Sequence, residues 1–254
     1  MMMKREIPVK RIAILIGNDK WGGDLLPGVR HDLEAMKIFL QSPAGGAWHP
    51  SQIFDINTQI SKQSFVSCLY KAIGEGYDYF FIYFGGHGEL SRTNVPLFIL
   101  PGGDSIELDE IRAILSTKPV LMISDSCQGI PEYEDGGVLN ESQRLFSTGS
   151  VIENFRAQRA FDNELCKLPP MLTYASAVSF GQFANDTDAG GLYTQSLLGA
   201  CADIIKSNSE TGVYGVCYPH TIAAQQVISR SNGEQRPSIR GYNRTYQPPF
   251  LVKL

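Results

Sequence analysis

The sequence lacks the features that would place the protein in a membrane or on a nucleic acid. No apolar run reaches the roughly 18 residues that a membrane-spanning helix needs. The stretch from Met1 to Lys10 has no apolar segment of the kind found in signal peptides. Lysine and arginine form no long run and the formal net charge is −4, whereas phosphate binding needs clustered cations. We therefore expect neither a membrane nor a nucleic acid as a partner.

Paired cysteines are also missing. The five cysteines are odd in number, scattered, and contain no CxxC pair that would indicate a metal site. This pattern is typical of free thiols in a reducing compartment, so we expect a cytoplasmic protein without a bound metal. The cysteines are Cys68, Cys127, Cys166, Cys201 and Cys217.

A glycine-rich phosphate loop is absent as well. The first apolar run, 11–17, is not followed by a GxxxxGK(S/T) motif. This absence counts against a nucleotide-binding domain of flavodoxin-like shape, which is one alternative for a chain of this kind. The chain also contains no internal repeat and no low-complexity segment.

Apolar runs that alternate with helical patterns do occur along much of the chain. The apolar fraction of 43% in 254 residues is enough for a large core. Strands alternating with helices predict an α/β fold, with a mostly parallel sheet that is covered by helices on both faces. We expect strands at 11–17, 52–56, 79–84, 95–100, 120–123, 170–176 and 247–252. We expect helices at 29–40, 61–73, 106–115 (with Asp104 and Glu107 as a capping box), 150–161, 192–205 and 220–229.

Two of these strands end in residues that suit nucleophilic catalysis. The strand 79–84 runs into Gly85-Gly86-His87-Gly88, and the strand 120–123 runs into Asp125-Ser126-Cys127. Neighbouring parallel strands would bring His87 and Cys127 to one edge of the sheet, where open α/β sheets bind ligands. A cysteine nucleophile needs such a base, together with amide donors for the oxyanion, here expected from Gly88 and Cys127.

Less specific explanations exist for each residue alone. A cysteine after a strand is most often a small buried apolar residue, and a histidine in a glycine-rich turn often has only a structural role. Found together, in this order and at two strand ends, they favour a cysteine peptidase. We expect His220 to be a surface or capping residue, and Cys68 and Cys201 to lie in the core.

The two boxes, Gly85–Gly88 and Asp125–Gly129, resemble those of the caspase-like peptidases, and most closely the metacaspase and orthocaspase branch. Weaker similarities extend over roughly residues 10–252 and include the segments 13–18, 26–32, 174–176, 191–194 and 248–250, together with Gln182. The resemblance implies a caspase-haemoglobinase fold, with a mostly parallel six-stranded central sheet flanked by helices on both faces, in a single domain, 1–254. Its parts would be a large-subunit-like part (10–129), a linker or lid (130–168) and a small-subunit-like part (169–254).

The resemblance also implies roles for individual residues. Cys127 would be the nucleophile and His87 the general base and acid, while Asp32 and Asp125 would form a pocket for Arg or Lys at P1, the residue before the cleaved bond. The spacing from His87 to Cys127 is shorter than the family's usual ~50 residues. Gly28 occupies the place of the arginine with which caspases bind an aspartate at P1, and Arg30 lies two positions further on, so a basic P1 is favoured. Aspartate at P1 and a catalytically silent scaffold remain alternatives.

Regulation is expected from the same resemblance. Stand-alone members of this group resemble effectors of prokaryotic antiphage defence or programmed cell death, which a partner protein or a small signalling nucleotide switches on. The segment 130–168 and the loop 181–191 are the expected places for an activator, and a monomer and a dimer both stay open. If P1 is basic, the linker offers candidate self-cleavage sites; the alternative is an ordered lid that is never cut. These sites are Arg144, Arg156, Arg159 and Lys167.

Many metacaspases require calcium, and this sequence contains two acidic clusters that we compare with known calcium sites. Neither has the spacing of an EF-hand, and acidic loops are usually just solvated. We therefore expect no metal and no cofactor. The clusters are Glu132, Glu134 and Asp135, and Asp186 and Asp188.

Overall fold

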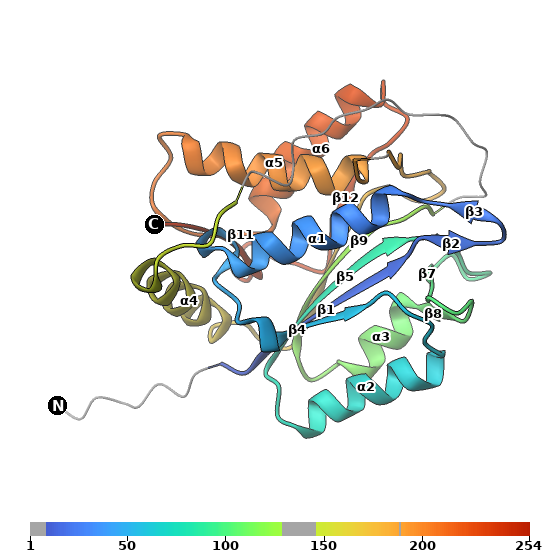
Figure 1. Cartoon of the computed structure of the whole chain (residues 1–254), viewed down its shortest axis with the longest axis horizontal. Helices are drawn as coiled ribbons and strands as arrows, with labels where there is room; N and C mark the ends of the chain where they lie inside the picture. Colours follow the sequence, from blue (N-terminus) through green and yellow to red (C-terminus); the bar gives the residue numbers. More distant parts are fainter. Residues whose placement is uncertain (1–8, 129–145, 188) are drawn as a thin grey trace.

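A six-stranded sheet forms the centre of the structure, a computed structural model that describes residues 9–128, 146–187 and 189–254. The strand order is β12-β10-β9-β5-β1-β4 (Figure 1). Five strands are parallel, and the edge strand β12 pairs antiparallel with β10. The strands are β1 (Arg11–Asn18), β4 (Ile53–Ile56), β5 (Tyr79–Gly86), β9 (Pro119–Asp125), β10 (Met171–Ser176) and β12 (Ser238–Arg240). The predicted mostly parallel six-stranded sheet is therefore confirmed.

Helices cover both faces of this sheet, because successive strand residues point to opposite sides. In β5, Phe81 and Tyr83 pack on one side, while Phe80, Ile82 and Phe84 pack on the other. The first face is covered by α1, α5 and α6, and the second by α2 and α3 (Figure 1). These helices are α1 (Gly28–Gln41), α2 (Lys62–Gly74), α3 (Leu108–Ile114), α5 (Leu192–Lys206) and α6 (Cys217–Arg230). In the part of the chain that the structure describes, no helix is both long and apolar enough to span a bilayer.

Three small sheets lie outside the central one. The strands expected at 95–100 and 247–252 form, but they pair with short strands elsewhere and not with the central sheet. Strand propensity does not specify a pairing partner, so this difference had no signal in the sequence. The small sheets are β2 (Lys20–Trp21) with β3 (Asp24–Leu25), β6 (Gly88–Leu90) with β7 (Pro96–Ile99) and β8 (Ser105–Glu107), and β11 (Gly212–Gly215) with β13 (Pro249–Lys253).

The helix α4 (Val151–Leu165) is held to the sheet by a buried charge. Its N-cap is Ser150, whose hydroxyl accepts the N–H of Glu153. Near its end, Asp162 lies 3.1 Å from Nη1 of Arg11, whose side chain is fully buried. Arg11 also donates from Nη2 to the carbonyl of Gly46 at 2.8 Å. A guanidinium at the start of β1 thus joins the sheet, a turn and α4.

Three local expectations were wrong. The capping box at the start of α3 is formed by Glu107 and Glu110, while Asp104 accepts the N–H of Lys62 at 2.8 Å. His220 is buried and its Nδ1 lies 2.7 Å from the hydroxyl of Tyr193, because α6 begins three residues earlier than expected and turns this side chain inward. Cys68 is exposed, because α2 packs through its neighbouring apolar positions.

Candidate active site

His87 and Cys127 lie at the same edge of the sheet because β5 and β9 are parallel neighbours. The register pairs Gly85 with Asp125, so each side chain stands two residues beyond the same rung. The two loops also touch at Gly88, where an added Cβ would lie 2.9 Å from the carbonyl oxygen of Cys127. The structure thus brings together the expected nucleophile, the expected base and the two residues expected to supply oxyanion donors.

The thiol of Cys127 is partly buried and faces a backbone carbonyl. Its Sγ donates to the carbonyl oxygen of Ala184 across 3.8 Å. Burial raises the pKa of the Cys127 thiol above its usual value, and the negative charges of Asp125 and Asp186 raise it further. The thiolate form is therefore disfavoured here at neutral pH.

The imidazole of His87 is half-buried and held by the hairpin of β2 and β3. Burial lowers the pKa of His87, while the charge and a backbone hydrogen bond of Asp24, and the charge of Asp19, act in the opposite direction. The indole of Trp21 lies against the ring, with centroids 6.1 Å apart. Nε2 is buried and has no hydrogen-bond partner among the described residues. A neutral imidazole with a free ring nitrogen can take a proton from a thiol.

Two buried carboxyl groups, Asp32 on α1 and Asp125 at the end of β9, lie beside this pair. Their residues are only 3% and 7% exposed. Asp32 accepts the backbone N–H of Gly191 at 2.9 Å, and Asp125 accepts both the N–H and the hydroxyl of Thr194, each at 2.8 Å. Burial raises the pKa of Asp32 well above its usual range, as does the charge of Asp125, and burial raises the pKa of Asp125 to about 6. The two residues expected to form a P1 pocket are therefore neighbours.

A third carboxylate, Asp186, completes this acidic group. It accepts the backbone N–H of Gly28, the first residue of α1, at 3.2 Å. Its charge also raises the pKa of both Asp32 and Cys127, after the larger effects of burial and of Asp125.

The sequence indicated Asp186 only as a candidate calcium ligand. Within the described ranges no three His, Cys, Asp or Glu side chains are grouped to hold a metal ion, and the other four acidic residues named above lie outside those ranges.

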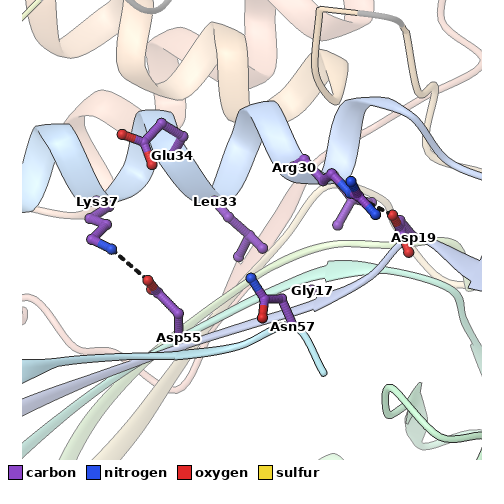
Figure 2. Close-up of a pocket in the computed structure, with 9 residues that line it drawn as sticks. Gly17, Asp19, Arg30, Leu33, Glu34, Lys37, Asp55 and Asn57 are labelled. Atoms are coloured by element: carbon purple, nitrogen blue, oxygen red, sulfur yellow. Dashed lines mark hydrogen bonds and ion pairs between the residues drawn. The ribbon is translucent and has the colours of Figure 1, made fainter. Parts of the chain in front are cut away.

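The structure separates Arg30 from the acidic group. Arg30 is exposed, two residues from Asp32 on α1, and its Nε donates to Asp19 at 2.8 Å. It borders a cavity of about 350 Å³, in which Lys37 pairs with Asp55 at 2.5 Å (Figure 2). Both cations of this cavity thus already have acidic partners. The cavity is lined by Gly17, Asp19, Val29, Arg30, Leu33, Glu34, Lys37, Asp55 and Asn57.

The candidate self-cleavage residues lie in different settings. Arg156 and Arg159 are within α4, and Lys167 follows its end. Arg144 lies outside the described residues. A peptidase needs an extended substrate, so Lys167 is in the most accessible backbone of the three described residues.

Sequence reasoning gave no role in the site to four residues that hold it together. Trp21 and Asp24 contact His87, while Thr194 binds Asp125 and its hydroxyl lies 2.8 Å from that of Tyr83. Tyr83 had the pattern of an ordinary core residue in an aromatic strand. A signal did exist for the hairpin, because Trp21-Gly22-Gly23-Asp24 contains the Gly-Gly pair typical of a two-residue turn.

Comparisons with known proteins agree with this fold. The model of the Caspase domain family matches residues 10–244. Caspase-1 from Spodoptera frugiperda is similar in structure, with a TM-score of 0.58, 15% identity, and coverage of 94% of this chain and 92% of that one. Protein GSU0716 from Geobacter sulfurreducens has a TM-score of 0.56 and 19% identity, with coverage of 96% and 100%. No curated protein matches the chain.

The fold and the family match together define the class of this protein. Because the family model spans nearly the whole chain, the protein belongs to the caspase family of cysteine-type peptidases.

Proposed function

We propose that this protein is an endopeptidase that uses Cys127 and His87 to cleave polypeptides after arginine or lysine. The observation that carries the proposal is the buried carboxyl pair, Asp32 and Asp125, beside the nucleophile. A guanidinium or ammonium placed there would offset the repulsion between the two carboxylates and stabilise their ionised forms. The nearby Asp186 adds to the negative field.

The proposed reaction assigns one role to each of the two side chains. Sγ of Cys127 attacks the carbonyl carbon as its proton passes to Nε2 of His87, and the new oxyanion is bound by the amides of Gly88 and Cys127. The C–N bond then breaks and the imidazolium gives its proton to the leaving amine. Water, activated by His87, hydrolyses the thioester and releases the free thiol.

An acidic P1 residue fits this site poorly. It would bring a further anion beside Asp32 and Asp125, and Arg30, the arginine nearest in sequence to Asp32, is exposed and paired with Asp19. A like charge in a buried site is strongly disfavoured. A silent scaffold is the remaining alternative, and the presence of both Cys127 and His87 counts against it.

The backbone that covers the carboxyl pair supports regulation of this activity by an activator. A Cβ added at Gly190 would lie 2.4 Å from Oδ1 of Asp32, and one at Gly191 would lie 2.3 Å from Oδ2 of Asp125. This backbone therefore packs directly on the carboxyl pair, and it must move before a P1 side chain can enter. We propose that a partner protein or a small signalling molecule promotes this movement, and that the physiological role is prokaryotic defence or cell death, as the family resemblance suggests. A self-cut, if one occurs, is expected first at Lys167.

The test is a comparison of peptide substrates that differ only at P1. Substrates that end in Arg, Lys, Asp or citrulline, a neutral analogue of Arg, are assayed with wild-type protein and with Cys127→Ala. We expect Cys127-dependent turnover of Arg and Lys, and a loss of roughly hundredfold or more for Arg in Asp32→Asn. Glu34→Gln, on the exposed face of the same helix, is the matched control. Turnover of Asp alone would refute the pocket assignment, and no Cys127-dependent turnover with any substrate, in the presence as well as the absence of candidate activators, would favour the scaffold.

A further inference from the structure

The hairpin of β2 and β3 has a tight turn that places two residues beside His87. Its register pairs Trp21 with Asp24, across Gly22 and Gly23. Both glycines have positive φ, 62° and 100°, which is the requirement of a tight two-residue turn. Directly opposed residues of a hairpin share one face, so Trp21 and Asp24 face the same side. One rung of the hairpin therefore holds the imidazole through Asp24 and lies against it through Trp21.

Trp21 remains 39% exposed, although tryptophan is usually highly buried. The other tryptophan, Trp48, is only 2% exposed. The free part of the Trp21 indole thus lies at the surface, directly next to the ring that handles the proton in the proposed reaction. An apolar side chain that covered this part would lose contact with water and gain binding energy.

The chemistry of the leaving group indicates which part of a substrate lies there. In the proposed mechanism His87 protonates the nitrogen of the residue after the cleaved bond, P1′, so that residue must stand beside the imidazole. The carboxyl pair Asp32 and Asp125 lies at the α5 end of the site, held by Gly191 and Thr194, whereas Trp21 contacts the histidine from the β2–β3 hairpin. The side chains of P1 and P1′ would thus contact different residues of the site.

We propose that Trp21 forms the P1′ subsite of this enzyme and favours a bulky apolar or aromatic side chain directly after the cleaved bond. The inference rests on the proposed function for the positions of the nucleophile and the base. It adds a second recognition element, so a preferred cleavage sequence would be a basic residue followed by Leu or Phe.

The first test varies P1′ alone. Internally quenched peptides with Arg at P1 and Leu, Phe, Gly, Lys or Asp at P1′ are compared by kcat/KM. We expect wild-type protein to favour Leu and Phe over Gly by roughly tenfold. The ratio of kcat/KM for the Leu or Phe substrate to that for the Gly substrate should fall towards one in Trp21→Ala and persist in part in Trp21→Phe. It should stay unchanged in Tyr70→Ala, which removes an exposed aromatic residue from α2.

A coumarin amide separates recognition from positioning, because it contains no P1′ residue. If Trp21→Ala slowed the coumarin, Gly and Leu substrates equally, Trp21 would only position His87 and the subsite would be refuted, while Cys127-dependent cleavage stood. A preference for Lys at P1′ that vanished in Asp24→Asn would also refute an apolar subsite.

Binding provides a readout that does not depend on turnover. In Cys127→Ala protein, Trp21 is the exposed one of the two tryptophans, so its emission dominates any change on binding. We expect an uncleaved Arg-Leu or Arg-Phe peptide to shift the emission to the blue, an Arg-Gly peptide to shift it much less, and Trp21→Phe to abolish the change. No difference between these peptides would overturn the inference, even if cleavage after basic residues were established.

Discussion

The carboxylate of Asp125 accepts two hydrogen bonds from one residue, the backbone N–H and the hydroxyl of Thr194, each at 2.8 Å. Thr194 lies in the first turn of α5, whose N-cap is Gly191, and the N–H of Gly191 donates to Asp32. The first N–H groups of this 15-residue helix thus bind the two acids of the proposed P1 pocket. The helix dipole favours negative charge at this end and partly offsets the penalty of burial.

The Thr194 hydroxyl should contribute measurably to stability. Thr194→Val keeps the shape and the backbone donor but leaves Asp125 and the Tyr83 hydroxyl each without one partner. We expect a loss of about 1–3 kcal/mol in the free energy of unfolding, measured with urea at pH 7. Thr194→Ser keeps the hydroxyl and is the control; equal stability of the two variants would show that this hydrogen bond contributes little.

The raised pKa of Asp125, about 6, makes stability depend on pH. An unfolded aspartate titrates near 3.9, so between roughly pH 4 and 6 the folded state binds more protons than the unfolded state. The contribution of Asp125 to the free energy of unfolding therefore falls as pH rises through this window. Asp125→Asn still accepts from Thr194, and it should remove this fall. Between pH 4 and 7 its free energy of unfolding should therefore rise relative to that of the wild type, by on the order of 2–3 kcal/mol. Parallel curves for the two proteins, from urea unfolding at each pH, would contradict this.

The pH dependence of alkylation should show that Cys127 is a neutral thiol near pH 7 and not a preformed thiolate. Burial raises the pKa of Cys127 and lowers that of His87, so both groups are neutral near pH 7. We expect the rate of modification by iodoacetamide, followed at each cysteine by peptide mapping, to keep rising beyond about pH 9. His87→Ala should leave this profile in place. Rapid modification that levels off near pH 6, and that needs His87, would indicate an ion pair instead.

Gly88 should not tolerate a side chain. An added Cβ would lie 2.9 Å from the carbonyl oxygen of Cys127 and 3.0 Å from Oγ of Ser126, so the two catalytic loops would have to separate. We expect Gly88→Ala to lower kcat by about tenfold or more, because misplaced groups lose catalytic efficiency. Gly199→Ala, within α5 and with open space around the added atom, should keep activity and gain up to about 1 kcal/mol in stability. Full activity of Gly88→Ala would show that the loops are freer than the structure indicates.

The buried ion pair of Arg11 and Asp162 should be essential for attachment of α4. Asp162→Ala leaves a fully buried guanidinium without its acidic partner, which we expect to reduce the free energy of unfolding by about 3–5 kcal/mol. Asp109→Ala breaks an exposed pair with Arg112 and should cost less than about 1 kcal/mol. The two variants are compared by urea unfolding, and similar small losses in both would show that the charge at Arg11 finds other partners.

The central sheet and the loops at its edge follow largely from local sequence. The apolar runs that form β1, β5 and β9 are buried on both faces, and the patterns that form α1 and α2 have one apolar side. Hydrophobic burial acts on each segment regardless of its neighbours, so periodicity alone predicted these elements. Parallel neighbours then require that residues beyond their carboxyl ends meet, which is why His87 and Cys127 were expected side by side.

The surroundings of these residues depended on contacts between distant segments. Thr194 reaches Asp125 from 69 positions away, and Asp186 reaches Gly28 from 158 positions away. His220 illustrates the same limit: a difference of three residues in where α6 begins turned an expected surface residue into a buried one. Local sequence determined the strands, the helices and the edge at which the chemistry lies. The tertiary structure decided which carboxyl groups are buried, which backbone covers them and which indole lies against the histidine, because burial and pKa depend on everything packed around a group and not on its own segment.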